Sequence, residues 1–234
     1  MITRKITRKF AVKKEGTKGT YETPDILIAF ESGLPKQTFT MLEDESITGT
    51  AFKNLPVQNV RAIEGSKSVV ADVATLPFFL EQLCGAEGVA GVYKPDMQKN
   101  DFSFSLASLD GVKTNKYAGL CMNNFMLVSE AENKVKINFD IISPEAEVRD
   151  DTSFPSTSTA PTIELLHRHL DGTGYFRIGD QANALASGDN ITDLKKIEFG
   201  NNWNFALDAV NSIKQLPAVS GQADMTLSIQ IAEH

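Results

Sequence analysis

Histidine, cysteine and tryptophan are scarce in this chain of 234 residues, which contains 3 His, 2 Cys and 1 Trp. So few histidines leave a Ser-His-Asp or Cys-His catalytic arrangement little to draw on. The two cysteines, Cys84 and Cys121, cannot form a disulfide framework. We expect both to be reduced and buried, in a protein made in a cytoplasm.

Long apolar runs are also missing. No stretch approaches the roughly 18–20 consecutive apolar residues of a membrane-spanning helix. The basic start of the chain has no apolar segment behind it and no small-residue cleavage site, so we expect no signal peptide. A hydrophobic content of 41% and a charged content of 23% are ordinary for a globular protein. The length allows one large β domain or two small ones.

Charge is distributed unevenly. The formal net charge is −7, yet the first eighteen residues hold seven lysines and arginines against the single acid Glu15. A basic arm can bind nucleic acid, but the acidic remainder of the chain would repel phosphates. We therefore expect residues 1–24 to form an arm that is solvated or pairs with acidic surfaces of neighbouring subunits. Residues 25–234 hold the strand-forming part of the chain, with a loop or insertion expected at about 150–161.

Alternation of apolar and polar residues dominates the rest of the chain. Period-two alternation places one face of a strand on a core and the other toward solvent or a partner, and it favours antiparallel sheets. Four runs show it: Phe102–Leu106, Val135–Ile141, Trp203–Leu207 and Met225–Ile231. The chain is therefore predicted to be mainly β, with two packed antiparallel sheets that form a sandwich or partial barrel.

One short helix is predicted over residues 76–84. Thr75 can cap it, Pro77 fits its first turn, and Gly85 can end it in a left-handed conformation. Its apolar residues share one face, which consists of Leu76, Phe79, Leu80 and Leu83. A helix of about two and a half turns is not stable alone, so it must flank a sheet.

Glycine-containing pairs mark the turns. Asp110-Gly111 predicts a hairpin, and Glu64-Gly65 predicts a tight turn between two strands within Val57–Val73. Three polar stretches are expected to be loops: Gly33–Leu55, Asp150–Pro161 and Gly179–Asn190.

No catalytic, cofactor or metal site is predicted. His167 and His169 would face the same side of a strand, but Asp171 is the one further ligand in reach beside them, so we interpret the pair as part of a polar strand face. Cys84 would lie at a helix C-terminus, where the dipole raises the pKa of a thiol rather than lowering it. Glu43, Asp44 and Glu45 lack the spacing of a calcium loop, so we interpret them as a solvated or interface loop.

The order of elements is similar to that of bacteriophage tail tube (major tail) proteins. Four segments carry the resemblance: the acidic loop Glu43–Phe52, the strand–glycine–strand–helix block Ile63–Gly85, the block Asp101–Ile142 around Tyr117-Ala118-Gly119, and Lys195–Ile231 with Asn201-Asn202 and a Ser-Gly turn. The resemblance covers most of residues 25–232. Residues 1–24 and Asp150–Pro161 lie outside it.

The resemblance implies a structural, non-enzymatic virion protein that is assembled in the host cytoplasm. Six subunits would form a ring, and rings would stack into a hollow tube around a tape-measure protein and later conduct double-stranded DNA. The implied partners are further copies of the chain, the tape-measure protein, the tail terminator, baseplate or tail-tip proteins and, in contractile tails, a sheath. The loop with Glu43, Asp44 and Glu45 becomes a candidate stacking contact between rings.

Two other functions remain open from the sequence. A β-sandwich that binds carbohydrate or a receptor would need an exposed aromatic platform, for which Trp203 and Tyr175 are the candidates. A small hydrolase with a β core would have to use His167 or His169. The scarcity of histidine makes this hydrolase the weaker alternative.

Overall fold

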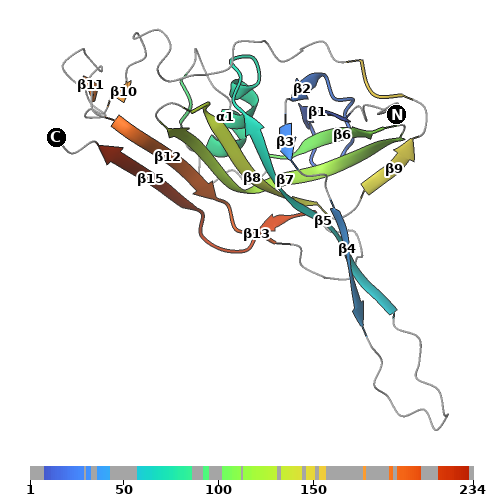
Figure 1. Cartoon of the computed structure of the whole chain (residues 1–234). Coiled ribbons are helices and arrows are strands. Elements are labelled where there is room, and N and C mark those ends of the chain that lie inside the picture. Colours follow the sequence, from blue (N-terminus) through green and yellow to red (C-terminus); the bar gives the residue numbers. More distant parts are fainter. Residues whose placement is uncertain are drawn as a thin grey trace, which may run out of the picture.

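The computed structural model describes residues 8–28, 30–32, 36–42, 57–85, 92–94, 102–111, 113–130, 133–143, 146–150, 153–156, 176–177, 190–191, 194–206 and 216–231. Within these residues the chain is mainly β with one helix (Figure 1). The elements are β1 Arg8–Lys14, β2 Ile26–Ile28, β3 Phe30–Ser32, β4 Lys36–Leu42, β5 Val57–Val70, α1 Leu76–Cys84, β6 Phe104–Asp110, β7 Lys113–Glu130, β8 Lys136–Ser143, β9 Ala146–Asp150, β10 Phe176–Arg177, β11 Asn190–Ile191, β12 Leu194–Asn202, β13 Phe205–Ala206, β14 Ala218–Val219 and β15 Asp224–Ile231.

Strand β7 divides the main antiparallel sheet into two halves. Up to Leu120 it pairs with β6 and β9, and β6 continues through β1 to β2. Beyond Leu120 it pairs with β8 and β12 instead. We call the first group the small half-sheet. The large half-sheet runs from β15 through β12, β7, β8 and β5 to β3 and β4.

A bend within β7 lets the two halves curl over one another. Gly119 has a φ of 68°, a left-handed conformation that glycine adopts without a steric penalty. The pairing register with β8 then shifts between Met122 and Phe125, which is the mark of a β-bulge. The predicted fold class is therefore confirmed, with the refinement that the two packed layers are halves of one curled sheet.

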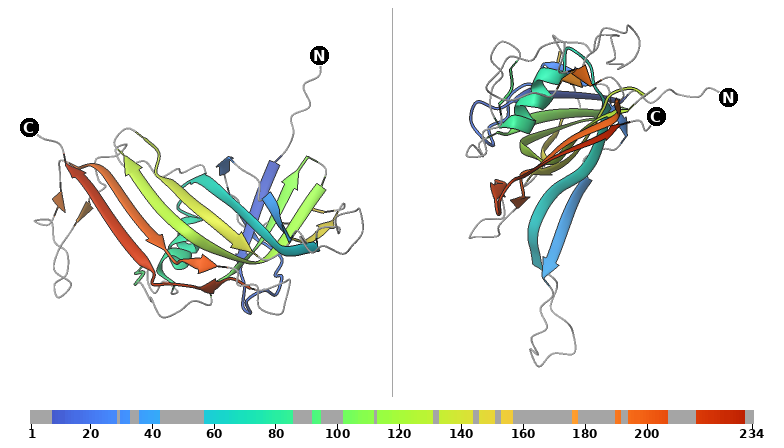
Figure 2. Two further views of the ribbon diagram at one scale, coloured as in Figure 1. Left: turned by 90° about the horizontal axis from the view of Figure 1, so that it is seen from below. Right: turned by 90° about the vertical axis from the view of Figure 1, so that its left-hand side faces the viewer.

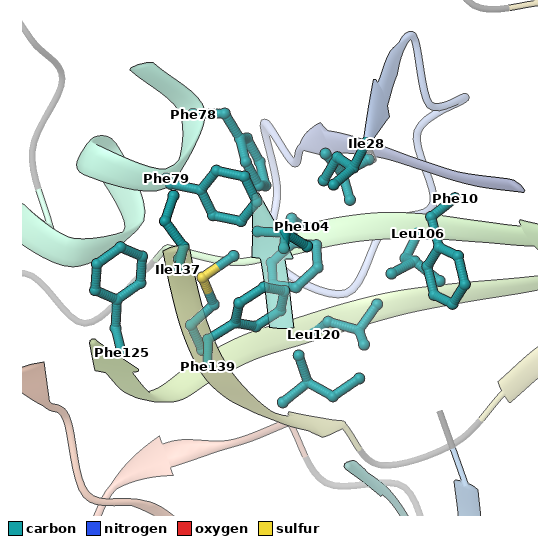
Figure 3. Packing of buried hydrophobic residues seen from close by; sticks show 14 of the residues in the cluster. Phe10, Ile28, Phe78, Phe79, Phe104, Leu106, Leu120, Phe125, Ile137 and Phe139 are labelled. Atoms are coloured by element: carbon teal, nitrogen blue, oxygen red, sulfur yellow. The ribbon is translucent and has the colours of Figure 1, made fainter. Parts of the chain in front are cut away.

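The hydrophobic core lies between the two halves and under the helix (Figure 3). The small half-sheet contributes residues such as Phe104 and Leu106, and the large half-sheet contributes Ile137 and Phe139. Phe79 of α1 is fully buried and packs its ring 5.5 Å from that of Phe139, centroid to centroid. The alternation in the sequence thus predicted the inward-facing residues of β6 and β8.

Helix α1 spans Leu76–Cys84, as predicted, and Gly85 ends it with a φ of 64° and an N–H that donates to the Glu81 carbonyl. Its buried face is centred on Phe79 and Leu83 and includes Phe78, while Leu76 and Leu80 are half-buried at its margin.

The predicted cap by Thr75 is wrong, because its side chain caps no backbone N–H of the helix. Asp72 organises the preceding turn instead. Its carbonyl accepts the N–H groups of Thr75 and Leu76, and its carboxylate accepts that of Ala74.

The predicted turn at Glu64-Gly65 is also wrong, since β5 runs through it as one strand of 14 residues. Its first half pairs with β4, and its second half, from Ile63 on, pairs with β8. Gly65 lies where the strand changes partner, and glycine in a strand often marks a bend rather than a turn. As a result, β4 and the first half of β5 project from the body as a two-stranded ribbon (Figure 1).

The N-terminal segment differs from the arm that charge suggested. Residues 8–14 form β1, which lies inside the small half-sheet between β2 and β6. Phe10, Ala11 and Val12 are all buried, and this short apolar run is masked in the sequence by the lysines on either side. The Asp110-Gly111 hairpin forms as predicted, with Asp110 opposite Lys113. The loop predicted over Gly33–Leu55 is wrong for residues 36–42, which form β4 because they pair with β5. The rest of that stretch from residue 43 on, and most of the other two expected loops, lie outside the described residues.

Truncation of Phe79 should destabilise the fold strongly, because its ring fills the space between α1 and the sheet. We expect Phe79→Ala to lower the free energy of unfolding by about 3–5 kcal/mol in urea denaturation of the unassembled protein. Leu80→Ala, on the half-buried margin of the same helix, is the matched control and should cost clearly less. Equal losses for the two variants would contradict the packing described here.

Candidate assembly surface

Strand β15 forms an edge of the large half-sheet (Figure 2). Among the described strands it pairs only with β12. Its sequence, DMTLSIQI, contains no lysine and no proline, the residues with which monomeric proteins protect a sheet edge. Since none of the other described strands pairs with the second side of β15, this side is available to a further strand.

The side chains of β15 continue the apolar face of the sheet beyond the core. Residues directly opposite one another in antiparallel strands share a face. One such row crosses four strands, from Ile137 through Leu127 and Phe199 to Leu227. Ile137 is 0% exposed and Leu227 is 54% exposed, with the two residues between them half-buried. Ile231 on the same strand is also 54% exposed.

The helix packs over the inner end of this row, where Phe79 and Ile137 belong to the same buried cluster. The C-terminal end of α1 is anchored above the end of β12, where the side-chain amide of Asn201 donates to the Leu83 carbonyl at 2.9 Å. The indole N–H of Trp203 donates to the Gln82 carbonyl at 3.3 Å. Among the described residues, these two bonds join the helix to the end of β12, whereas Leu227 and Ile231 of β15 remain 54% exposed.

The opposite face of the large half-sheet is hollowed, and it carries many polar side chains beside apolar ones such as Met126. A groove of about 690 Å³ crosses five strands, and its lining includes Ser66, Asn124, Asp140, Asn202 and Asp224. The Asp140 carboxylate accepts hydrogen bonds from Ser66 Oγ at 2.5 Å and from the Asn124 amide at 2.8 Å. Gly200 lies in the lining, where an added Cβ would stand 2.9 Å from Thr226 Oγ1.

Acidic side chains outnumber basic ones on this polar face. The pairing register places five acids and two lysines there among the described residues: Glu64, Glu130, Asp140, Glu198, Asp224, Lys136 and Lys196. Lys196 and Glu198 form a partly exposed ion pair at 2.7 Å, and the hydrogen bond that the amine donates to this carboxylate raises the pKa of Lys196. The face thus presents hydroxyl, amide and carboxylate groups with an excess of negative charge.

The described residues offer little for catalysis. Burial raises the pKa of the Cys84 thiol and raises that of Cys121 to about 12, so neither is a ready nucleophile. No group of three or more potential metal-ligating side chains occurs within the described part of the chain. His167 and His169 lie outside it.

Trp203 is 3% exposed and packs with Cys121 and Phe205, so it is no surface platform for a sugar. This removes one of the two aromatic residues on which a carbohydrate-binding function would depend. The other, Tyr175, lies outside the described residues.

Of the predicted site residues, the structure brings Leu76, Phe79, Leu80 and Leu83 together on α1 against the core. The candidate stacking residues Glu43, Asp44 and Glu45 lie outside the described residues, between the two strands of the β4–β5 ribbon. Sequence reasoning missed the exposed side of β15. Its alternation of apolar and polar residues matches that of the buried strand β8. The pattern therefore predicted that the apolar side of β15 would be buried, but the structure leaves that side exposed.

Lys67 is a buried cation on the core face of β5. It is 4% exposed, lies opposite Phe139, and borders a small space lined by apolar residues that include Val12 and Phe104. Its amine donates to the Ser66 carbonyl at a long 3.5 Å. Desolvation lowers the pKa of Lys67 to about 8.

Comparison with models of known protein families identifies a relationship. The sequence model of the family described as "Phage tail tube protein" matches residues 6–232, nearly the whole chain. No individual curated protein matches. Among the described residues, none of the helices is long and apolar enough to cross a membrane.

Replacement of Lys67 by methionine should stabilise the protein, and the gain should depend on pH. Because the pKa of the lysine is about 8 in the folded state and 10.5 normally, the unfolded chain binds more protons between these values. The stability of the parent protein therefore rises with pH across this window. We expect Lys67→Met to gain about 1–3 kcal/mol at pH 7 and progressively less toward pH 10.5.

Urea denaturation of the unassembled protein at several pH values measures this difference. Lys196→Met, a substitution at a partly exposed lysine on the other face of the sheet, should show no comparable gain. A Lys67→Met advantage that stays constant from pH 7 to 10.5 would contradict the assignment.

Proposed function

Since this chain belongs to the phage tail tube protein family, we propose that it forms rings of six subunits that stack into a hollow tail tube. The edge strand β15 is the observation that carries this proposal. A strand with unpaired backbone groups and a bare apolar face is an aggregation hazard in a monomer. A closed ring removes the hazard, because each free edge is covered by the next subunit.

The opposite edge of the large half-sheet supplies the partner. It consists of β3 and β4, which pair with β5 alone among the described strands. β4 has 7 residues and β15 has 8, so their lengths are compatible. Contact between these two different edges is heterologous, and such contacts close into rings when the rotation between subunits is a fraction of a full turn.

The two-sided character of the sheet determines which face would line the tube. In our proposal the polar face, with its groove and its excess of carboxylates, points into the lumen. An acidic lining repels the phosphate backbone, so that double-stranded DNA slides through without adhering. The apolar face then points outward, beneath the small half-sheet and α1.

The β4–β5 ribbon supports a stacking role for residues 43–56, which lie between β4 and β5 in the sequence. The ribbon itself projects from the body of the subunit (Figure 1). We propose that Glu43, Asp44 and Glu45 in this loop contact the adjacent ring. The tape-measure protein, the tail terminator and the tail-tip or baseplate proteins are the further partners proposed for the tube.

A charge on the edge strand should prevent ring formation without unfolding the subunit. We expect Leu227→Lys to keep the thermal stability of the parent, since the side chain is 54% exposed, and to abolish rings and tubes in negative-stain electron microscopy. Met126→Lys is the matched control: Met126 is 41% exposed but lies on the interior strand β7. Normal tubes from Leu227→Lys would refute the role of β15.

Neutralisation of the acidic loop should separate ring formation from stacking. We expect the combined variant Glu43→Gln, Asp44→Asn and Glu45→Gln to form rings in normal yield but few or short tubes. Electron microscopy and sedimentation distinguish the two products. Tubes of unchanged length would show that these carboxylates take no part in stacking.

A further inference from the structure

The carboxylate of Glu15 is the centre of a buried polar junction just after β1. The residue is 5% exposed. One carboxylate oxygen accepts hydrogen bonds from Ser105 Oγ and the Gly119 N–H, both at 2.8 Å. The other accepts from Ser103 Oγ at 2.6 Å and from the Gly19 N–H at 2.8 Å. Four donors to one carboxylate stabilise its charge in a buried position.

These hydrogen bonds join three separate parts of the chain. Ser103 and Ser105 lie at the start of β6, Gly19 lies in the turn after β1, and Gly119 is the bend residue of β7. The backbone N–H of Glu15 also donates to the Ser103 carbonyl at 3.0 Å. The junction therefore fixes the N-terminal turn, residues 15–19, against the bend at which the two half-sheets meet.

The two glycines of the junction form a notch for a residue near the C-terminus. Both have positive φ, and a Cβ added to either one would lie 2.7 Å from Cδ2 of Leu216. Leu216 therefore packs directly on the backbone of the two glycines, because the Cβ of any other residue type would occupy this space. The contact connects positions about 100 and 200 residues apart in the sequence.

Lys18, in the same turn, contacts Pro217, the residue that follows Leu216. Its amine donates to the Pro217 carbonyl at 2.6 Å and lies 5.3 Å from the centroid of the Phe205 ring. Pro217 leads directly into β14, which pairs with β13, and the Ser220 N–H donates to the Asn204 carbonyl. Four residues later the edge strand β15 begins.

We propose that the N-terminal turn positions the edge strand for assembly, so that only a subunit whose β1 has docked presents β15 to its neighbour. The order of contacts supports this coupling: Glu15 fixes the glycine notch, the notch and Lys18 fix residues 216–217, and these set the start of β15. Lys18 and Leu216 are positioning residues, since neither lies on the edge itself. The inference rests on the proposed ring function.

Two substitutions loosen this connection while leaving the core in place. Lys18→Met keeps an apolar stem but loses the hydrogen bond to Pro217. Leu216→Ala empties the notch at a side chain that is already 36% exposed. Lys13→Met is the matched control. Lys13 lies on β1, close to Lys18 in the sequence, and its amine pairs with Asp25 at 3.2 Å rather than with residues 216–217. Lys18→Arg, which keeps a cationic donor, should restore the behaviour of the parent.

Hydrogen exchange of the unassembled protein and the rate of tube formation are the measurements. We expect Lys18→Met and Leu216→Ala to exchange the β15 amides that pair with β12 about tenfold faster, as for the loss of one hydrogen bond or contact. Exchange in β5 and β8 should stay unchanged, and tube formation should slow by a similar factor. Lys13→Met and Lys18→Arg should match the parent in both measurements.

The inference is overturned if β15 exchanges at the parent's rate in both variants, or if it exchanges faster but tubes form at the normal rate. It is also overturned if exchange rises equally across the whole sheet, which would indicate general destabilisation. A parent protein that forms no rings would count against the proposed function instead. The exchange pattern of β15 would in that case still report whether the turn positions the strand.

Discussion

The bend of β7 at Gly119 is the constraint on which the rest of the structure depends. One strand of 18 residues serves both half-sheets, and it can do so only if its backbone turns without losing its hydrogen bonds. Glycine provides the left-handed conformation, and the Glu15 carboxylate accepts the N–H that the bend directs away from the ladder. The core then forms between the two halves, and α1 closes its open side through Phe79.

The same geometry leaves one part of the sheet uncovered. The large half-sheet extends from β15 to β3 and β4, and among the described residues its β15 end is covered only in part, since Leu227 and Ile231 are 54% exposed (Figure 2). Burial along the row from Ile137 to Leu227 falls step by step as the cover ends. The assembly surface that we propose needs no special residues. It arises because a regular sheet extends beyond its packing partner.

Much of the local structure could be predicted from the sequence. The inward residues of β6 and β8, the helix with its glycine end and the Asp110-Gly111 hairpin all depend on neighbours within a few positions. The failures have physical causes as well. Gly65 lies where β5 changes its pairing partner, not in a turn. Strand β1 was not predicted, because its three apolar residues lie between lysines and hardly change the basic composition of the segment. The Glu15 junction could not be foreseen, since it joins residues from four distant segments.

The sequence by itself determined that the chain is a mainly β protein, which residues alternate between the two faces of each strand, and that conventional catalytic residues are scarce. These properties follow from side-chain period and residue type, which are local. Only the tertiary structure decided which alternating strand is core and which is edge. β8 and β15 carry the same pattern, but Ile137 is sealed beneath other layers while Leu227 is open. That difference depends on strand order and on where α1 ends, and both are set by contacts between distant parts of the chain.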